Sequence, residues 1–582
     1  MRWAETVRVT NNGNVDCLAT QASRAACWWD GALRGQIMAA KQPRIVFVTG
    51  GVSSSLGKGI ASASLARLLS SRGLKVASLK MDPYLSIDAG TLAPGEHGEC
   101  WVTPDSLETD LDLGHYYRFT DGELYAASCV TAGQVYFDVL SAERRGAYLG
   151  RTVQVVPHIT DEIRRRVLRA GGWDVDHGVS VGPADVLIAE IGGTVGDIEI
   201  LPFLEAVRQL RADLPLGSVC SLHLTLIPSV GPGHELKTKP SQHSVAMLRS
   251  HGVSPDILLA RCSEPVPDAL RRKLALTCGV HESRVVVGLD APSIYAIPEA
   301  LAAEKLDEAV AAVLGLDCGE LDLSAWRAAV EPLIHPPARS VKIGIVGKYT
   351  AGHDAYLSVV EALRHAAGAA GASVEVVQVD AQAVADGMTS LDGLDGIVVP
   401  GGFGARGISG MMIAAGDARR RDIPFLGICL GLQVAVVEYA RNVLGMAGAT
   451  SSEWDEPGPK VITLLSSQRE VVDMGGTMRL GNWPALLLPD SRVAQLYGAP
   501  PGSTITVDER HRHRYEVNPG FRGHLEAAGL ACSGMSPDKR LVELVEIPGH
   551  KFFVATQSHP ELLSKPGRPH PLFAGLVAAA LK

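Results

Sequence analysis

The stretch "RIVFVTGGVSSSLGKGIASASLARLL", residues 44–69, sets the fold class of this 582-residue chain. Its first half is rich in β-branched and aromatic residues, as a buried strand is, and its last part places apolar residues at helical spacing. A loop of glycines and serines joins the two parts. Strand, glycine-rich turn and helix in this order are typical of a parallel sheet covered by helices. We therefore predict an α/β protein.

Strand-like and helical runs alternate along most of the chain and fall into two series. The first series continues to about residue 315 through β-rich runs such as "KVASLKMD", "ADVLIAEIGG" and "RVVVGLD". The second begins at Val341 with "VKIGIVGKY" and continues through "SVEVVQVD", "GLDGIVVPGG" and "IPFLGIC". This pattern predicts two doubly wound domains in tandem, residues 43–315 and 341–582. Residues 316–340, which include paired prolines, are predicted to be a linker.

Residues 1–42 show no sustained strand or helix period. We expect a disordered extension here, and Met38 is a candidate for the true start of the protein. The segment lacks the apolar core of a secretory signal, and no apolar run approaches the ~18 residues of a membrane-spanning helix. These features predict a cytoplasmic protein with no membrane partner.

The bulk composition limits the classes of partner. A net charge of −9 argues against nucleic acid or an anionic membrane, so any phosphate binding must come from local sites. The ten cysteines are scattered without a CxxC pair, which predicts reduced thiols and not disulfides or zinc ligands.

The glycine- and serine-rich loop that ends in Lys58 predicts a phosphate site. Backbone amides of such a loop and the start of the following helix bind phosphate oxygens, and the lysine adds a positive charge. The spacing differs from the usual GxxxxGK[ST] pattern, because five residues separate Gly51 from Gly57 and a glycine follows the lysine. Its place after the first strand favours a nucleoside triphosphate over a plain turn.

Without the usual hydroxyl, magnesium ligands must come from elsewhere. Asp112 in "ETDLDLGHYYRF" and Glu190 at the end of "ADVLIAE" are the candidates, because ligands collect where parallel strands end. Lys80 is a further candidate for offsetting charge on a transferred phosphate. Lys237 and Lys239 in "LKTKPSQHSV" are candidate clamps for a second triphosphate, although exposed lysine pairs are common in loops.

The stretch "FLGICLGLQ", residues 425–433, predicts a nucleophilic thiol at Cys429. Apolar strand, G-x-C-x-G turn and helix resemble a nucleophile elbow, in which a strained turn exposes the side chain. The helix start and adjacent amides favour the thiolate. His559 and Glu561 in "FVATQSHPEL" supply a proton carrier and a carboxylate to orient it. The backbone of "PGGFG", around Gly402, offers donors for an oxyanion.

Taken together, these motifs resemble the CTP synthase family. The resemblance runs in order from about Pro43 to Phe573 through "FVTGGVSSSLGKG", "MDPYLSIDAGT", "ETDLDLGHY", "EIGGTVGDIE", "KTKPSQHSV", "PGGFGARG", "LGICLGLQ", "RHRHRYEVN" and "HPEL". It implies an N-terminal P-loop-like, dethiobiotin-synthetase-like amidoligase domain and a C-terminal class I glutamine amidotransferase domain. It also implies ATP-dependent amination of UTP to CTP, with ammonia released from glutamine and a 4-phosphorylated UTP intermediate.

The resemblance carries a set of site residues. Catalysis of glutamine hydrolysis falls to Cys429, His559 and Glu561. ATP would bind at Ser55, Leu56, Gly57, Lys58, Gly59, Ile60 and Asp112, with Mg²⁺ on Asp112 and Glu190. UTP, and CTP as feedback inhibitor, would bind at Ser54, Asp197, Ile198, Glu199, Lys237, Thr238, Lys239, Pro240, Ser241, Gln242 and Lys273. Glutamine would bind at Gly402, Leu430, Gly431, Leu432, Gln433, Glu453 and Arg514. The family further implies GTP as allosteric activator and homodimers that pair into homotetramers.

Several positions depart from the family pattern. They are Ser53, Ser86, Ala89, Cys100, Trp101, Thr277, Leu289, Ala405 and Ser558, and the stretch "GWDVDHGVSVGPA" looks inserted. These changes bear on effector sensitivity and on the strictness for UTP, while the metal, phosphate and thiol positions are all present.

Three other functional hypotheses compete with this interpretation. A cobyrinate-type amidase has a similar build, but it has no need of "KTKPSQHSV" and generally lacks the paired thiol and histidine motifs. A nucleotide-driven switch of the partition-ATPase kind would need another lysine early in the phosphate loop. A scaffold that has lost catalysis is disfavoured because every charged group of both sites is present.

Overall fold

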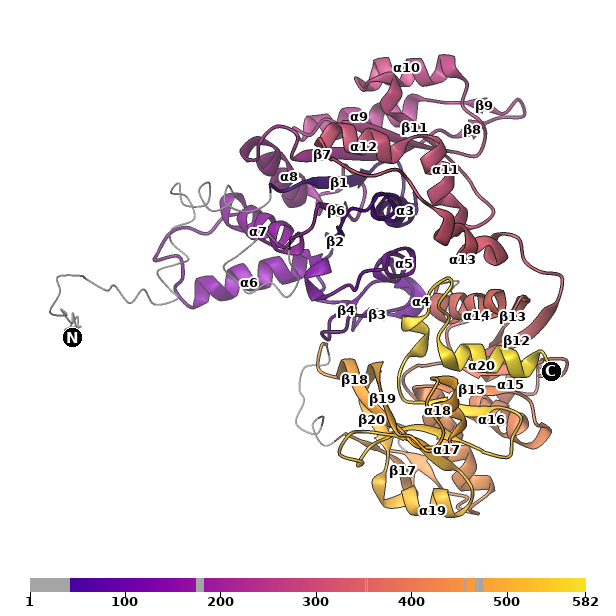
Figure 1. The fold of residues 1–582 in the computed structure, drawn as a ribbon. Coiled ribbons are helices and arrows are strands. Elements are labelled where there is room, and N and C mark those ends of the chain that lie inside the picture. Colours follow the sequence, from indigo (N-terminus) through magenta and orange to yellow (C-terminus); the bar gives the residue numbers. More distant parts are fainter. Residues whose placement is uncertain are drawn as a thin grey trace, which may run out of the picture.

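The structure, a computed structural model, describes residues 42–173, 183–350, 352, 354–454, 456–465, 468 and 475–582. Most of the predicted N-terminal extension, Met38, and most of the inserted stretch at residues 172–184 lie outside the described residues. Figure 1 shows two bodies, one formed by the chain up to Ile334 and the other by the chain from Ser340 onward.

The first domain is built on a seven-stranded parallel sheet with the order β11-β10-β7-β1-β6-β2-β5. Its strands are β1 (Ile45–Gly50), β2 (Val76–Asp82), β5 (Cys129–Thr131), β6 (Val186–Ile191), β7 (Val219–Leu226), β10 (Ile257–Cys262) and β11 (Val285–Leu289). Short antiparallel pairs are β3 (Trp101–Val102) with β4 (Glu108–Thr109), and β8 (Ser229–Val230) with β9 (Glu235–Leu236).

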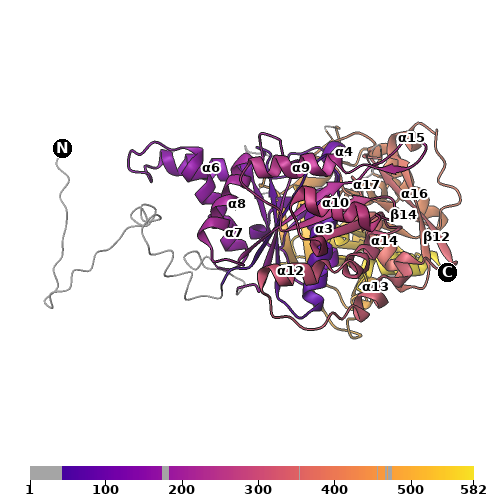
Figure 2. The ribbon, with the colours of Figure 1, turned by 90° about the horizontal axis from the view of Figure 1, so that it is seen from above.

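Helices cover both faces of this sheet. They are α3 (Lys58–Ser71), α4 (Pro94–His97), α5 (Asp112–Phe119), α6 (Ala132–Arg144), α7 (Thr160–Ala170), α8 (Leu201–Asp213), α9 (Lys239–Ser250), α10 (Asp268–Cys278), α11 (Ile297–Ala303) and α12 (Leu306–Leu314), with short turns η1 (Ala126–Ser128), η2 (Val155–Ile159), η4 (Glu282–Arg284) and η5 (Ile294–Ala296). Figure 2 shows α7 and α8 on one side of the sheet and α3 on the other. Strand β1 contributes side chains to the apolar core on each face of the sheet. Val46 and Val48 belong to one apolar cluster, and Ile45 and Phe47 belong to the other.

The second domain is built on a nine-stranded sheet with the order β13-β12-β14-β15-β23-β22-β21-β18-β19. Its strands are β12 (Ser340–Gly347), β13 (Ser373–Asp380), β14 (Gly396–Val399), β15 (Phe425–Ile428), β18 (Arg479–Leu487), β19 (Ile505–His513), β21 (Ala531–Met535), β22 (Val542–Glu546) and β23 (Phe553–Thr556). The first five strands of that order are parallel, as predicted for a doubly wound domain. The other four extend it in antiparallel fashion, which the sequence pattern did not indicate.

A small second sheet and further helices complete the described part of this domain. The sheet is β16 (Thr450–Ser451), β17 (Lys460–Leu464) and β20 (Tyr515–Val517). The helices are α14 (Leu357–Ala369), α15 (Ala381–Ala385), α16 (Ile408–Arg421), α17 (Leu430–Asn442), α18 (Arg492–Leu496), α19 (Arg522–Ala527) and α20 (Pro571–Ala580), with turns η7 (Pro519–Phe521) and η8 (Pro560–Leu563).

The segment predicted as a linker contains a helix. It contains α13 (Ser324–Ile334), whose Trp326 packs with ring centroids 5.3 Å from Phe119 and 6.0 Å from Tyr295. Burial of this tryptophan against the first domain explains why the segment is ordered, because a large aromatic surface leaves water. Within the described part of the chain, no helix is both long enough and apolar enough to span a membrane.

Candidate functional site

Cys429 sits in a strained turn between β15 and α17. Its φ is +53°, a left-handed value that a residue with a side chain rarely adopts. The two nearby glycines permit this turn. A Cβ at Gly427 would lie 2.8 Å from the backbone of Gly431, and a Cβ at Gly431 would lie 2.0 Å from the carbonyl oxygen of Val399. The sequence therefore forces the thiol out at the carboxyl end of a parallel strand, as in other nucleophile elbows.

Cys429, His559 and Glu561 line one cavity. The Nδ1 atom of His559 is 2.7 Å from Oε1 of Glu561, and its Nε2 atom has no hydrogen-bond partner among the described residues. Burial opposes a charge on this imidazole, but the charges of Glu561 and Cys429 outweigh burial and raise the pKa of His559 to about 10. A protonated imidazole beside a sulfur nucleophile is suited to give its proton to a leaving amine.

One backbone group and one side-chain group also contact the sulfur atom of Cys429. Sγ of Cys429 lies 3.6 Å from the carbonyl oxygen of Arg512 and 3.7 Å from Nε2 of Gln557. A Cβ at Gly401 would lie 2.9 Å from Cε1 of His559, so a side chain there would displace the imidazole. Neither Arg512 nor Gln557 was a sequence candidate.

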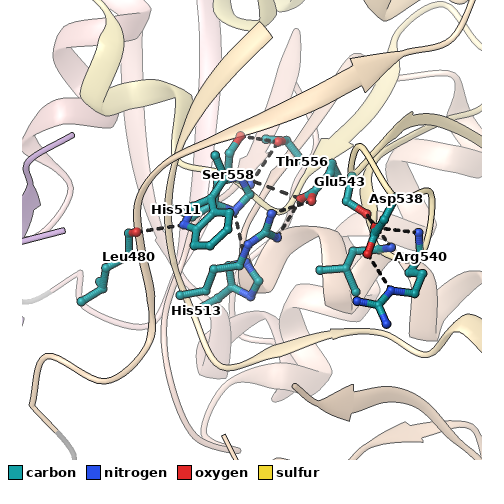
Figure 3. A network of polar contacts seen from close by, with 12 residues as sticks. Leu480, His511, His513, Asp538, Arg540, Glu543, Thr556 and Ser558 are labelled. Carbon is teal, nitrogen blue, oxygen red and sulfur yellow. Dashed lines mark hydrogen bonds and ion pairs between the residues drawn. The ribbon is translucent and has the colours of Figure 1, made fainter. Parts of the chain in front are cut away.

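The departure at Ser558, next to the histidine, has a structural explanation. Figure 3 shows Ser558 beside Thr556, and their hydroxyl oxygens are 2.6 Å apart. The hydroxyl of Ser558 also donates to Glu509 at 3.3 Å. Because the residue is buried, these two contacts satisfy its hydroxyl.

The predicted glutamine residues divide into three groups. Around the cavity, Gly402 is a cavity-lining residue, and a Cβ there would lie 3.4 Å from Leu430; Oε1 of Glu453 accepts from the Gly404 amide at 2.7 Å. Further out, Gln433 donates to the Tyr515 carbonyl at 3.1 Å and Arg514 to Gln468 at 2.5 Å. The remaining two, Gly431 and Leu432, pack inside the domain.

Lys348 also lies beside the predicted glutamine residues, although the sequence motifs did not indicate it. Its ammonium donates to the carbonyl oxygens of Phe403 (3.1 Å) and Gly404. Burial lowers its pKa to about 8, against the opposing charge of Glu453. Its position in "GKY", directly after strand β12, was the available signal.

The cavity extends across the domain boundary. Besides the thiol and the histidine, its walls include Pro94, Glu99 and Cys100 of the first domain. Glu99 accepts from the amide of Ser358 at 2.7 Å, and burial raises the pKa of Glu99 to about 7. The space around Cys429 is therefore completed by the other domain.

The phosphate loop of the first domain has the backbone form of an anion site. Ser55 and Gly57 have φ values of +55° and +95°, and Ser54 and Ser55 are exposed. Lys58 donates to the Gly193 carbonyl at 2.6 Å, and burial lowers its pKa. Arg261, which the sequence did not indicate, donates to the carbonyl oxygens of Ser55 and Leu56 at 3.2 and 3.3 Å.

Four carboxylates surround Lys80 behind this loop. Its ammonium contacts Asp82 (3.4 Å), Asp110 (3.2 Å), Asp112 and Glu190 (3.7 Å). Burial raises the pKa of Glu190 to about 7, with Lys80 opposing the shift. The predicted ligands Asp112 and Glu190 are thus brought together, with a lysine between them.

These residues fit a magnesium ion shared with phosphates. Mg²⁺ takes one or two carboxylates and completes its shell with phosphate and water oxygens. Among the described residues no group of three or more metal-binding side chains forms a complete cage. A Cβ at Gly59 would lie 2.2 Å from Oδ1 of Asp112, so only glycine leaves this carboxylate its place against the phosphate loop.

The predicted UTP residues lie in the phosphate loop, in the loop after β6, and at helices α9 and α10. A Cβ at Gly196, in the loop after β6, would lie 3.7 Å from Met247 of α9. In this loop Asp197 accepts from the Thr194 amide at 3.1 Å, and Ile198 and Glu199 are exposed. At α9, Thr238 and Ser241 are buried, whereas Lys237, 2.5 Å from Glu235, and Lys273 on α10 are more accessible. The other predicted residues at the start of α9 are Lys239, Pro240 and Gln242.

Helix α9 also packs against the phosphate loop. A Cβ at Gly51 would lie 1.8 Å from the hydroxyl of Ser244. Ser244 is 2.8 Å from Nε2 of His223, whose Nδ1 is 2.8 Å from the hydroxyl of Thr49. Burial lowers the pKa of His223 to about 3, so this buried chain of contacts is neutral. These contacts connect the phosphate loop, which carries the ATP candidates, to helix α9, which carries UTP candidates, at one end of the sheet.

A phosphate-binding α/β domain and a thiol–imidazole–carboxylate domain that share a cavity define the class of glutamine-dependent synthetases. Residues 44–316 match the family model "CTP synthase N-terminus", and residues 352–579 match "Glutamine amidotransferase class-I". The chain is 52% identical over 553 residues to the CTP synthase of Acidothermus cellulolyticus, covering 93% of this chain and 96% of the relative. The chain belongs to the CTP synthase family.

Other relatives give the same result. The CTP synthase of a Synechococcus species is 53% identical over 540 residues, covering 92% of this chain and 96% of the relative. Among solved structures, the glutaminase domain of Trypanosoma brucei CTPS with bound acivicin is 37% identical, with a TM-score of 0.37, over 41% of this chain and 93% of that domain.

Proposed function

We propose that this protein is a ligase that uses ATP to aminate UTP to CTP, with ammonia released from glutamine. The observation that carries the proposal is the shared cavity, in which the thiol and histidine of one domain face residues of the other. Identity of 52% to a CTP synthase over nearly the whole chain supports the substrates. The reaction is the ATP-dependent step of pyrimidine biosynthesis that makes CTP.

In the second domain, the sulfur of Cys429 attacks the carbonyl carbon of the glutamine amide, and His559 protonates the amide nitrogen, which leaves as ammonia. The raised pKa of His559 supports this donor role at neutral pH. Glu561 orients the imidazole, and backbone amides near Gly402 stabilise the oxyanion. Glutamine is held by Gly402, Leu430, Gly431, Leu432, Gln433, Glu453 and Arg514.

In the first domain, ATP phosphorylates O4 of UTP, and ammonia then displaces phosphate at C4. A carbonyl oxygen is a poor leaving group and phosphate a good one, which is why ATP is required. Lys58 and Lys80 offset negative charge during the transfer. Asp112 and Glu190 would hold Mg²⁺, which would supply positive charge to offset that of the phosphate oxygens. ATP binds at residues 55–60 together with Asp112.

The regulatory part of the proposal follows the family. UTP, and CTP as feedback inhibitor, bind at Ser54, Asp197, Ile198, Glu199, Lys237, Thr238, Lys239, Pro240, Ser241, Gln242 and Lys273. GTP activates glutamine hydrolysis, and homodimers pair into homotetramers. Exposed side chains in the loop after β6 and on α10 are compatible with a ligand there.

The decisive variant is Cys429→Ala. We expect CTP formation from glutamine to fall by at least about a thousandfold, because the nucleophile is lost, while ammonia still supports the reaction. CTP formation is followed by its absorbance with ATP, UTP and Mg²⁺, with Cys318→Ala as the matched control. Persistence of glutamine-driven activity, or loss of both activities in a folded variant, would contradict the proposal.

A further inference from the structure

A buried ion pair crosses the domain boundary beside the shared cavity. Oε1 of Glu108, on the β3–β4 hairpin, is 2.7 Å from Nε of Arg512, on β19. The side chain of Glu108 is 0% exposed and that of Arg512 is 12% exposed. Oε2 of Glu108 accepts from the Gly476 amide at 3.3 Å, and Arg512 donates to the Gly90 carbonyl at 3.2 Å. Glu108 of the first domain is therefore held by two groups of the second, and Arg512 of the second domain by two groups of the first.

At one end, the pair reaches the thiol. The carbonyl oxygen of Arg512 lies 3.6 Å from Sγ of Cys429, and its guanidinium lies 5.2 Å from the ring centre of Phe403. Arg512 and Phe403 both line the cavity. A displacement of Arg512 therefore changes the wall of the cavity and a contact of the nucleophile together.

At the other end, the pair reaches the carboxylates of the phosphate site. Glu108 is followed within four residues by Asp110 and Asp112, which both contact Lys80. The hairpin that carries Glu108 is fixed in turn, because the Thr109 hydroxyl donates to the Trp101 carbonyl at 3.0 Å. A Cβ at Gly90 would lie 2.2 Å from Oε2 of Glu108. There is little room for Glu108 to move independently of its hairpin.

We propose that Glu108 and Arg512 are a positioning pair that transmits nucleotide binding in the first domain to the thiol of the second. A buried pair resists separation, because either charge left alone in the interior is strongly unfavourable. When the binding of ATP and UTP shifts Asp110 and Asp112, the hairpin that carries Glu108 shifts with them. Arg512 then moves with the hairpin, because it stays paired with Glu108. Glutamine hydrolysis then rises when the ammonia acceptor is in place. This inference rests on the proposed function of the two sites.

Other contacts hold the domains together, so the role of the pair can be tested alone. Ser106, on the same hairpin, donates to the Leu480 carbonyl at 2.9 Å, and Lys565 donates to the Thr120 carbonyl at 2.9 Å. Neither Ser106 nor Lys565 lines the cavity. Ser106→Ala is thus a matched control that removes a domain contact from this hairpin without touching the thiol pocket.

The test measures glutamate release with and without ATP and UTP, in the presence of Mg²⁺, and takes the ratio of the two rates. We expect Arg512→Met to lower this stimulation ratio by about fivefold or more, toward one. Arg512→Lys should retain part of the ratio, and Ser106→Ala should retain all of it. Ammonia-driven CTP formation, measured in each variant, should stay within about twofold of the wild type.

Three results would overturn the inference. They are an unchanged ratio in Arg512→Met, an equal fall of both rates that leaves the ratio intact, and a wild-type ratio of one. If Arg512→Met does not fold, Glu108→Gln provides the same comparison with a side chain of equal shape, and the same reduced ratio is expected. Failure of the wild type to make CTP from UTP and ammonia would instead reject the proposed function.

Discussion

In the thiol site, the neighbours of His559 raise the pKa of its imidazole far above the usual value. Its imidazole is buried, yet Glu561 at 2.7 Å and the sulfur of Cys429 hold its pKa at about 10. An imidazole with so high a pKa stays protonated through the neutral and mildly basic range. The role proposed for it, as a proton donor to the leaving amide nitrogen, therefore depends on the neighbouring carboxylate.

The variant Glu561→Gln tests this dependence. The carboxylate favours the imidazolium, so its loss lowers the pKa of His559, and protonated imidazole becomes scarce at a lower pH. We expect the basic limb of the pH profile of kcat/KM for glutamine hydrolysis to move to lower pH, with a rate loss of about tenfold or more at pH 8. Glu561→Asp, which keeps the charge, should shift the limb less. An unmoved basic limb in Glu561→Gln would show that Glu561 does not set this pKa.

At the residue scale, sequence motifs could indicate candidate catalytic groups but not the residues that contact them. Cys429 and His559 stand in short patterns whose chemistry is local. Arg512 and Lys348 act through contacts with residues far along the chain, and no spacing in the sequence reveals such contacts. The string "RHRHRYEVN" offered three arginines, and only folding of β19 determines which one reaches the thiol.

Strand β19 separates its side chains by alternation. Arg510 and Arg512 reach the first domain, at the Val102 carbonyl and Glu108. His511 and His513 point the other way, and Figure 3 shows them side by side near Glu543. Their ring nitrogens are 3.1 Å apart. One strand thus supplies charged contacts to the domain junction and a neutral imidazole pair to the interior, because neighbouring residues face opposite sides of a sheet.

This histidine pair makes stability depend on pH. Burial, with added repulsion from Arg479, lowers the pKa of both His511 and His513 well below the usual value. Below about pH 6.5 the unfolded chain binds protons that the native pair does not, so the native state loses stability as pH falls. Glu543, which holds Arg479 at 2.8 Å, faces the same cluster and remains in place.

We expect His511→Asn to weaken this dependence. Between pH 7.5 and 5.5, the wild type should lose about 1 kcal/mol more free energy of unfolding than the variant, measured by urea denaturation. The exposed His281→Asn is the control. Parallel pH curves for the wild type and His511→Asn would mean that the pair takes up protons in the native state.

At the element scale, the sequence predicted what local pattern determines. The parallel strands of both domains stand in β-rich runs followed by helical stretches, and both series are present. The antiparallel strands β18, β19, β21 and β22 depend on pairing between distant segments and had no such alternation. Helix α13 was obscured by the prolines around it, since Pro332 lies inside the helix and two more follow it.

The two domains meet through a buried polar network as well as the cavity. The Tyr295 hydroxyl donates to Glu361 at 2.6 Å and lies 2.8 Å from Nε2 of His365, and Nδ1 of His365 is 3.1 Å from the Ser564 hydroxyl. Tyr295 belongs to the first domain and the other three to the second. The network therefore acts with α13 to fix one domain on the other.

Removal of one hydroxyl should loosen this junction. We expect Tyr295→Phe to lower the free energy of unfolding by about 1–3 kcal/mol, because Glu361 and His365 lose a buried partner. Urea denaturation followed by tryptophan fluorescence measures the change. Tyr439→Phe, which removes a hydrogen bond of 2.7 Å to Ala528 within the second domain, is the comparison variant. Stability equal to the wild type in Tyr295→Phe would show that water satisfies the network.

At the scale of the whole molecule, the sequence indicated two domains and two chemistries but not how they face each other. The walls of the thiol cavity come from residues more than 300 positions apart, as Cys100 and Cys429 illustrate. Domain placement follows from shape and charge across the junction, and neither has a periodic signature in the chain.

The β3–β4 hairpin has one more consequence, for how this chain can vary. Between Glu108 and Asp112 lie only Thr109, Asp110 and Leu111, so the junction contact and the phosphate-site carboxylate are separated by a spacer of fixed length. A single inserted or deleted residue would change the separation of the two anchors by up to about 3.6 Å. Substitutions inside the spacer keep its length. An insertion or deletion would displace the junction contact of Glu108 relative to Asp112, and so misalign the thiol site and the phosphate site together.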